Sequence, residues 1–284
     1  MSAASPFVQT TAEIVHHEPV SSRYFLLRLK CPEIATRARS GQFVMLACAP
    51  DIGGRSEPLL PRPLALLDAR AESGEIEILY FVAGRGTEIL RATAEAASAA
   101  RLRIIGPLGH GFEPIPNVDV HIALGGGSGV APLVFFFRRC ADSKTRSAWR
   151  LILAARTSAQ LARPDVVKNP GELLLATDDG SAGFRGNAVQ ALEHLLSGEL
   201  KDRAVGIYAA GPEAMMDGAA RAGQRLGLPV RVSLEGRMAC GVGVCRACVV
   251  DGLSPHPKTG LLRRTVCQDG PVFDTKELAG WNCE

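Results

Sequence analysis

The chain contains 284 residues, of which 46% are hydrophobic and 21% charged, and its formal net charge is +3. This length predicts two or three domains, and the composition excludes a fibrous or wholly disordered protein. The 32 basic residues are scattered among 29 acidic ones. Because nucleic-acid binding needs a concentrated basic surface, we expect no nucleic-acid partner.

The beginning of the sequence and its apolar runs bear on location. Residues 1–15 lack the basic start and apolar core of a secretory signal. The densest apolar run, residues 130–137, is too short to cross a bilayer. We therefore expect a cytoplasmic protein with no membrane partner, in which closely spaced cysteines indicate a metal site rather than a disulfide framework.

The first predicted domain spans residues 1–114 and is an antiparallel β-barrel. Segments 24–29, 43–46 and 75–82 are rich in β-branched, aromatic and leucine residues, and turn-forming residues separate them. Only residues 86–100, rich in alanine and leucine, predict a helix in this domain. A connection rich in proline and glycine, residues 106–116, marks the expected end of the barrel.

The second predicted domain spans residues 115–230 and alternates strands with helices. Apolar segments 120–124, 150–155, 172–177 and 204–209 predict strands, and residues 188–196 predict one of the helices. Continuous apolar strands between helices are typical of a parallel sheet covered on both faces. We expect a Rossmann-like α/β nucleotide-binding domain.

The last predicted domain spans residues 231–284 and contains a characteristic cysteine spacing. Its pattern is Cys-x4-Cys-x2-Cys followed by a distant cysteine, formed by Cys240, Cys245, Cys248 and Cys267. This is the plant-type ligand pattern of a 2Fe–2S cluster, and Gly241 and Gly243 would let the backbone wrap closely around inorganic sulfide. A structural zinc site is the main alternative, although zinc more often binds two separate Cys-x2-Cys pairs. Buried thiols without a metal are a third interpretation.

A glycine-rich turn, residues 124–132, lies between a predicted strand and a predicted helix. Gly125, Gly127 and Gly129 would let a pyrophosphate approach the N–H groups at the start of that helix. Gly211 and Pro212 also follow a predicted strand, as do residues 177–181. Because open parallel sheets bind ligands at the carboxyl ends of their strands, these turns predict a nucleotide site. A plain tight turn is the alternative, since the glycines do not match the strict dinucleotide motif.

A third motif lies in the predicted barrel. Arg62-Pro63-Leu64-Ala65 forms one part, and residues 84–87 after a predicted strand form the other. An arginine in an apolar strand can neutralise a phosphate, while Gly86 and Thr87 at a helix start supply backbone and hydroxyl donors. The combination suits a flavin nucleotide, although each half is also common as ordinary structure.

The order of these parts, with residues 106–112, 176–181, 233–248 and 266–273, resembles the electron-transfer subunits of heteromeric, NAD-linked dihydroorotate dehydrogenases. These are members of the ferredoxin reductase superfamily, and the resemblance covers nearly the whole chain. It implies an oxidoreductase subunit of pyrimidine (UMP) biosynthesis with FAD, a 2Fe–2S cluster and NAD as electron acceptor. It also implies an FMN-containing catalytic subunit as partner, with two copies of each in a heterotetramer.

The resemblance assigns residues to these groups. It implies FAD contacts at Arg62, Pro63, Leu64, Ala65, Leu79, Tyr80, Phe81, Gly86 and Thr87. It implies cluster ligands at Cys240, Cys245, Cys248 and Cys267. The glycine-rich turns described above are the remaining candidates for binding NAD. Electrons would then pass from the partner's FMN through the cluster and FAD to NAD, and no catalytic acid, base or nucleophile is expected in this chain.

Two departures from the family pattern bear on NAD. The family usually has serine at Ala65 and cysteine at Ala210, so two polar groups expected near the flavin and the nicotinamide are missing. We expect FAD and the cluster to remain while hydride exchange with NAD is slowed or the acceptor differs. Alternative functions are a diaphorase-like subunit of a hydrogenase or sulfide dehydrogenase, and a noncatalytic zinc-bound interaction module.

Overall fold

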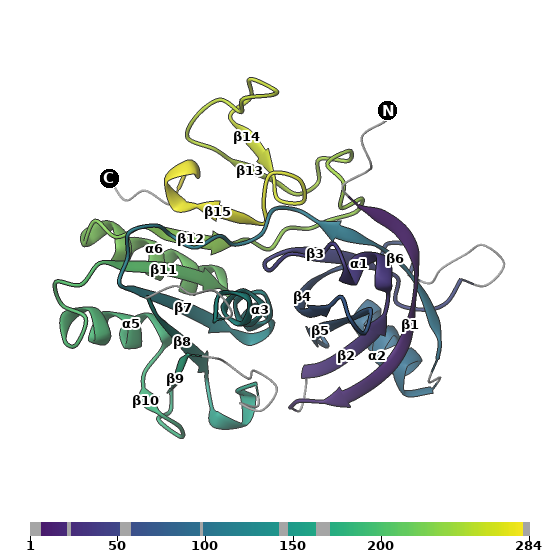
Figure 1. Cartoon of the computed structure of the whole chain (residues 1–284), viewed down its shortest axis with the longest axis horizontal. Helices are drawn as coiled ribbons and strands as arrows, with labels where there is room; N and C mark the ends of the chain where they lie inside the picture. Colours follow the sequence, from purple (N-terminus) through teal and green to yellow (C-terminus); the bar gives the residue numbers. More distant parts are fainter. Residues whose placement is uncertain are drawn as a thin grey trace.

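The computed structural model describes residues 7–21, 24–51, 58–96, 99–141, 147–162 and 171–280. A closed six-stranded barrel lies beside a seven-stranded sheet, with a small hairpin above both (Figure 1). The predicted combination of an antiparallel β-barrel and an α/β domain is confirmed. In the described part of the chain, no helix combines the length and the apolar character needed to cross a membrane.

The barrel strands are antiparallel and follow the order β1-β2-β5-β4-β3-β6. They are β1 (Val8–Pro19), β2 (Tyr24–Lys30), β3 (Phe43–Leu46), β4 (Arg62–Arg70), β5 (Glu75–Phe81) and β6 (Arg101–Leu108). Along β2, Leu27 and Leu29 are fully buried, whereas Arg28 between them points away from the core and pairs with Glu77 at 2.9 Å. Alternation of this kind gives each strand one apolar face for the barrel interior.

Two helices accompany the barrel, where the sequence predicted one. The expected helix is α2 (Arg85–Ala96), and it ends before residue 100. The additional helix is α1 (Pro32–Ala35), a single turn that starts with a proline. Four residues are too few to show helical periodicity, so this element had no detectable pattern in the sequence.

The second sheet has the strand order β10-β9-β8-β7-β11-β12-β15. Its strands are β7 (Val120–Gly126), β8 (Ala148–Ala155), β9 (Glu172–Thr177), β10 (Phe184–Arg185), β11 (Val205–Ala210), β12 (Val230–Ser233) and β15 (Val272–Asp274). All neighbouring pairs are parallel except β12 with β15. The helical segments are η1 (Gly127–Gly129), α3 (Val130–Ala141), η2 (Ser158–Gln160), α5 (Ala188–Ser197), α6 (Glu213–Arg225) and η3 (Thr275–Glu277).

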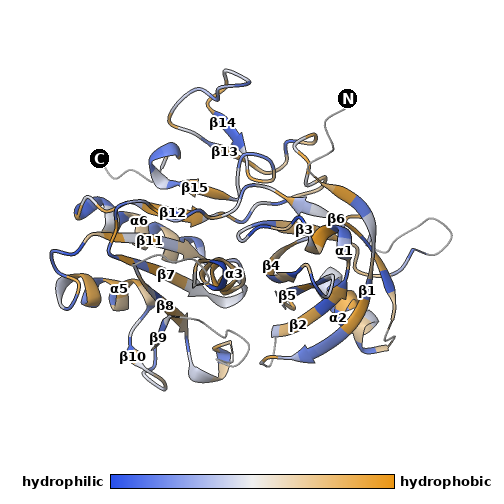
Figure 2. Cartoon of the chain, viewed as in Figure 1, coloured by the Kyte–Doolittle hydropathy of each residue, from blue (hydrophilic) through white to orange (hydrophobic). Residues whose placement is uncertain are grey.

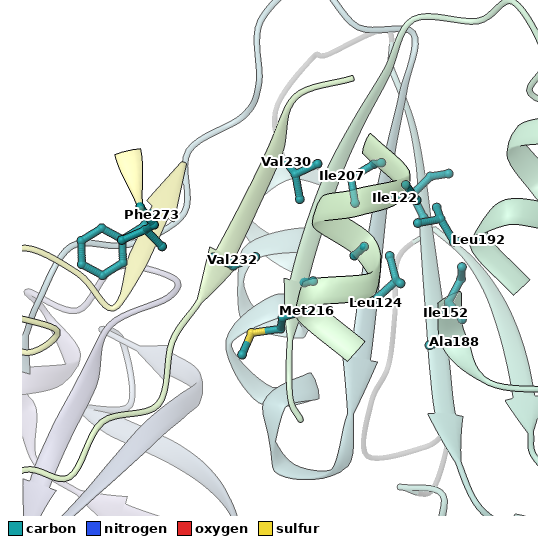
Figure 3. Close-up of a cluster of buried hydrophobic side chains, with 14 of the residues drawn as sticks. Ile122, Leu124, Ile152, Ala188, Leu192, Ile207, Met216, Val230, Val232 and Phe273 are labelled. Carbon is teal, nitrogen blue, oxygen red and sulfur yellow. The ribbon is translucent and has the colours of Figure 1, made fainter. Parts of the chain in front are cut away.

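Helices cover both faces of this sheet because successive strand residues point to opposite sides. Ile122 and Leu124 of β7 belong to the core formed with α5 and α6, which Figure 3 shows together with Met216 and Leu192. Ala123, between them, belongs to the core formed with α3. The predicted burial of the strands on both faces is therefore confirmed.

The last segment of the chain returns to this sheet. After β12 the chain forms the cysteine loop and a hairpin of β13 (Val249–Asp251) and β14 (Arg263–Thr265). It then adds β15 to the sheet edge, where Phe273 is paired with Val232 (Figure 3). The described part of the last predicted domain, residues 231–280, thus shares a sheet with the nucleotide-binding domain, and the boundary at residue 230 remains a proposal.

The barrel and the sheet are held together by α3. Its Phe135 is buried in the barrel core, its Arg138 lies 3.3 Å from Asp68 of β4, and its Arg139 donates to the Ala69 carbonyl at 2.6 Å. These contacts bring the glycine turn before α3 against the barrel strands that carry the flavin motif.

Candidate cofactor sites

A cavity of about 300 Å³ lies between the barrel and the sheet. Six of the residues implied for FAD line it, namely Pro63, Leu64, Ala65, Leu79, Tyr80 and Phe81. The opposite wall comes from the turns at the carboxyl ends of β7 and β11 and from residues after β12, including Met238. The cavity is mostly apolar and lies at the junction of two domains, as expected for the ring system of a flavin.

A second cavity of about 410 Å³ adjoins the first. Gly127, Gly211 and Pro212 line it, and Gly127 has a φ of +59°. A Cβ on Gly127 would meet the Tyr24 hydroxyl at 2.6 Å, so a larger residue would fill the cradle. The turn therefore fits a nucleotide that approaches the backbone before α3, as the sequence predicted.

Not every predicted glycine lines a cavity. A Cβ on Gly125 would lie 2.9 Å from the Val130 side chain, so this glycine allows β7 and α3 to pack closely. A Cβ on Gly129 would strike the Ala210 carbonyl, although Gly129 also lines the flavin cavity. These two glycines thus set the close approach of β7, α3 and β11 that shapes the site.

Arg62 and Gly86, predicted to bind the FAD phosphate, lie together at the start of α2 and are not among the residues that line the flavin cavity. A Cβ on Gly86 would strike the Arg62 guanidinium, so only glycine leaves this guanidinium where it lies across the start of α2. Arg62 also donates to the Leu60 carbonyl at 2.7 Å. Thr87 differs from expectation, because its hydroxyl accepts hydrogen bonds from the N–H groups of Ala83 and Gly84 and holds the loop itself.

The two departures in sequence both face the flavin cavity. Ala65 on β4 and Ala210 at the end of β11 line it. Neither contributes a hydrogen-bonding side chain, so the cavity is apolar at the two positions, one on each wall, where the resemblance led us to expect a hydroxyl and a thiol.

Glu235 is a site residue that the sequence analysis missed. It lines both cavities and is the carboxylic acid they share among the described residues. The residue as a whole is exposed, yet desolvation of its carboxyl raises the pKa, and no hydrogen bond or ion pair in the described part of the chain engages it. The one signal in the sequence was its place within the motif quoted for residues 233–248.

The cysteine loop is shaped for sulfur at its centre. Gly243 has a φ of +79° and donates its N–H to the Cys267 sulfur at 3.1 Å, while Val242 and Cys245 donate to the Cys240 sulfur at 3.4 Å each. Gly241, with a φ of +72°, presses against Met45 and Leu108 of the barrel. N–H groups turned towards thiolates and glycines in left-handed conformations fit an iron–sulfur cluster.

The environment of Cys240 favours its thiolate. Burial acts to raise its pKa, but the hydrogen bonds from the N–H groups of Cys245 and Val242 lower it to about 7. Metal ligands must be deprotonated, so this shift suits a ligand, whereas burial raises the pKa of Cys267, another of the four cysteines, to about 12. Among the described residues no three His, Cys, Asp or Glu side chains form a site for a single metal ion. A 2Fe–2S cluster divides its four thiolates between two irons, so each iron takes only two.

Two family models match the chain. The iron–sulfur cluster binding domain of dihydroorotate dehydrogenase B matches residues 235–279, and the oxidoreductase NAD-binding domain matches residues 123–221. Among solved structures, a chain of an NADH-dependent reduced ferredoxin–NADP oxidoreductase is 26% identical, with a TM-score of 0.77 over 98% of this chain and 91% of that one. The ferredoxin reductase of carbazole 1,9a-dioxygenase, 21% identical with a TM-score of 0.67, shares the fold over 81% of this chain and 70% of its own.

Curated relatives are similar over almost the whole length. The dihydroorotate dehydrogenase B (NAD(+)) electron transfer subunit of Desulforamulus reducens is 34% identical over 91% of this chain and 94% of its own. The subunit of the same name from Geobacillus thermodenitrificans is 33% identical over 93% and 96%. The family models and the similar structures thus support FAD, a 2Fe–2S cluster and NAD as the cofactors of this chain. The chain belongs to the family of dihydroorotate dehydrogenase B (NAD(+)) electron transfer subunits.

Proposed function

We propose that this chain transfers electrons from the FMN of a dihydroorotate dehydrogenase catalytic subunit, through a 2Fe–2S cluster and FAD, to NAD in pyrimidine biosynthesis. The observation that carries the proposal is the arrangement of the three candidate sites around residues 234–240. A flavin exchanges hydride with a nicotinamide and single electrons with a cluster, so a flavin site must adjoin both of the others.

The nucleotide cavity adjoins the flavin cavity directly. The flavin and nucleotide cavities share Phe81, Ser128, Gly211, Leu234 and Glu235 on their walls. Because the two cavities adjoin at these residues, a ring bound in one can contact a ring bound in the other, as hydride transfer requires. The glycine turn and Gly211-Pro212 would hold the NAD backbone, and residues 63–65 and 79–81 would hold the flavin ring.

The proposed cluster site also lies close to the flavin cavity. Met238 lines the flavin cavity, and Cys240, the first proposed cluster ligand, follows only two residues later. A chain advances at most about 3.6 Å per residue, so the two Cα atoms lie within about 7 Å of each other. The buried core that contains Cys248 and Cys267 also contains Met45 and Leu108 of the barrel. The four cysteines would therefore hold the cluster against the barrel, next to the flavin.

The partner and its assembly belong to the proposal as well. The relatives are named as electron transfer subunits, which supports a separate catalytic subunit. We extend this to an FMN-containing subunit, to a heterotetramer with two copies of each, and to a cytoplasmic location. Native mass spectrometry of the co-purified complex measures the stoichiometry.

The experiment is an anaerobic titration followed by absorption. Dihydroorotate is added to the isolated holo chain and then to the chain with its co-purified catalytic subunit. We expect bleaching of the flavin and cluster bands only with the partner present, and equal bleaching by NADH in both samples. Bleaching of the isolated chain by dihydroorotate, or no bleaching in the complex, would contradict the proposal. Anaerobically prepared material must also contain iron and acid-labile sulfide.

A further inference from the structure

Exposed hydrophobic side chains gather in the cluster-bearing segment. Of the nine large hydrophobic residues that are exposed in the described part of the chain, five lie between residues 244 and 262, namely Val244, Val249, Leu253, Leu261 and Leu262. Their exposed fractions run from 36% to 80%, with Val244 the highest. The hairpin that carries most of them stands clear of the barrel and the sheet (Figures 1 and 2). Apolar side chains gathered in this way are typical of an interaction site.

A basic groove of about 390 Å³ lies between this segment and the barrel. Three basic side chains line it, Arg246, Lys258 and Arg263, together with the rings of His110 and His256. The groove has one carboxylate among the described residues, Asp269. That group already accepts hydrogen bonds from the Thr265 N–H at 2.6 Å and the Thr265 hydroxyl at 2.9 Å.

His256 also engages Asp269, and its tautomer follows from its neighbours. The N–H groups of Lys258 and Thr259 point at its Nδ1, at 3.1 and 3.2 Å, so Nδ1 accepts. Nε2 therefore carries the hydrogen and donates to Asp269 at 2.9 Å. Asp269 offsets only part of the charge of Arg246, Lys258 and Arg263, so the groove keeps an excess of positive charge that can attract an anionic group.

The groove and the exposed side chains surround the open edge of the cysteine loop. Cys267 lines the groove, and Cys245 is an exposed ligand, whereas Cys248 and Cys267 are only 4% and 2% exposed. Any protein that exchanges electrons with the cluster from outside has its shortest approach at the Cys245 edge. Val244 and Arg246 flank that cysteine on either side.

We propose that this surface docks the catalytic subunit, with carboxylate side chains of an acidic partner patch entering the groove and an apolar patch covering the exposed hairpin residues. The inference rests on the proposed function and specifies the surface used and the chemistry of its partner. The catalytic subunit is the occupant because it must reach the exposed Cys245 edge to exchange electrons, and an acidic patch on it would match the three cations of the groove, which are offset by Asp269 and, at Arg263, by Asp251.

The same hairpin leaves the nucleotide site open. Val250 lines the nucleotide cavity, whereas Val249 and Asp251, its neighbours in β13, point to the opposite side of the strand. Arg263 is paired with Asp251 across the hairpin and lies 3.6 Å from its carboxylate. A partner on the Val249 side therefore contacts the basic groove without covering the NAD cavity.

The test measures association of the holo chain with the purified catalytic subunit by biolayer interferometry at 50 and 300 mM NaCl. Lys258→Glu reverses one groove charge at an exposed side chain and is expected to lower the association rate at least tenfold at low salt, with a smaller effect at high salt. Leu262→Ser leaves the charge alone and is expected to speed dissociation. The control is Lys201→Glu, the same charge change at an exposed site just before β11, at the opposite end of that strand from the turn that lines the cavities.

Iron content and NADH-driven flavin reduction are measured on each preparation, so that a damaged variant is recognised. Lys258→Glu and Lys201→Glu associating equally fast, or wild-type association that does not depend on salt, would overturn the docking surface. The proposed docking surface would also be overturned if Lys258→Glu weakened only self-association of the chain, or only its binding to phosphatidylserine vesicles, and left association with the catalytic subunit unchanged. If the wild-type pair associates but dihydroorotate bleaches nothing, the proposed function fails instead.

Discussion

Gly86 offers a sharp test of the proposed FAD phosphate site, because a single methyl group there is expected to displace the arginine that holds the phosphate. In Gly86→Ala the new Cβ would overlap the Arg62 guanidinium. The overlapping atoms are the far end of a flexible side chain, so the fold persists and Arg62 moves. Gly86 lies in the first turn of α2, where alanine is favoured over glycine by up to about 1 kcal/mol, and the apoprotein should lose no stability.

The size of the effect follows from the bond that is lost. A hydrogen bond to a charged group contributes about 1.5 to 3 kcal/mol, and each 1.4 kcal/mol changes an equilibrium constant tenfold. Gly86→Ala should therefore raise the Kd for FAD by about 10- to 150-fold. The measurement is a titration of apoprotein with FAD, followed by flavin fluorescence.

Gly84→Ala is the matched control, because nothing lies within 4 Å of a Cβ at that position in the same loop. Its Kd for FAD should stay within twofold of the wild type. Equal Kd values for the two variants, or a lower melting temperature of Gly86→Ala apoprotein, would refute the assignment of Arg62 as the phosphate-binding residue.

Three further predictions concern the other sites. Because desolvation raises the Glu235 pKa, its carboxyl loses its proton at a higher pH than a glutamate in water does, and the rate of wild-type NADH-driven flavin reduction should change in that pH range. The stopped-flow rate of flavin reduction in Glu235→Gln should not change with pH over that range. If the wild type and Glu235→Gln show the same dependence on pH, Glu235 is excluded as a site residue. Ala65→Ser places a hydroxyl in the flavin cavity, and one hydrogen bond of about 1 kcal/mol should speed NADH-driven reduction about fivefold; an unchanged rate counts against the missing hydroxyl. Gly243→Ala combines a φ of +79° with a clash against Gln268 and should lose more than half of its iron and acid-labile sulfide, whereas Gly227→Ala, at a φ of +66° in open space, should retain both; equal losses would contradict the loop geometry.

The elements that the sequence predicted well are those with clear local boundaries. The strands at residues 43–46 and 172–177 coincide with β3 and β9 to the residue. Residues 43–46 and 173–176 are continuous apolar runs with glycine or aspartate close to their ends, so the local pattern indicates both the strands and their limits. The barrel and α/β classes followed from the same reasoning.

The elements that escaped prediction depend on contacts between distant residues. β15 has only three residues, and its pairing with β12 arises about 40 positions away in the chain. No local periodicity encodes such a contact. Glu235 was missed for a related reason, because its importance lies in two cavities whose walls come from the barrel, the sheet and the last segment.

The cysteine spacing could be interpreted without the fold because ligand geometry acts over a few residues. Gly241 and Gly243 were expected to free the backbone around sulfide, and both have left-handed conformations. By contrast, the role of Gly125 in packing against Val130 and the loop bonds of Thr87 could not be separated from nucleotide binding before the structure. Glycine and threonine serve both purposes with the same local pattern.

The pairing of β15 with β12 has a consequence for engineering. The segment that bears the cysteines leaves the sheet after Ser233 and rejoins the same edge at Val272, so it is a loop clamped at both ends rather than a tail. A chain cut shortly after Cys267 would keep all four thiols yet release one anchor and uncover Val232. Transferring this cysteine segment to another reductase would therefore require β15 as well as the four cysteines.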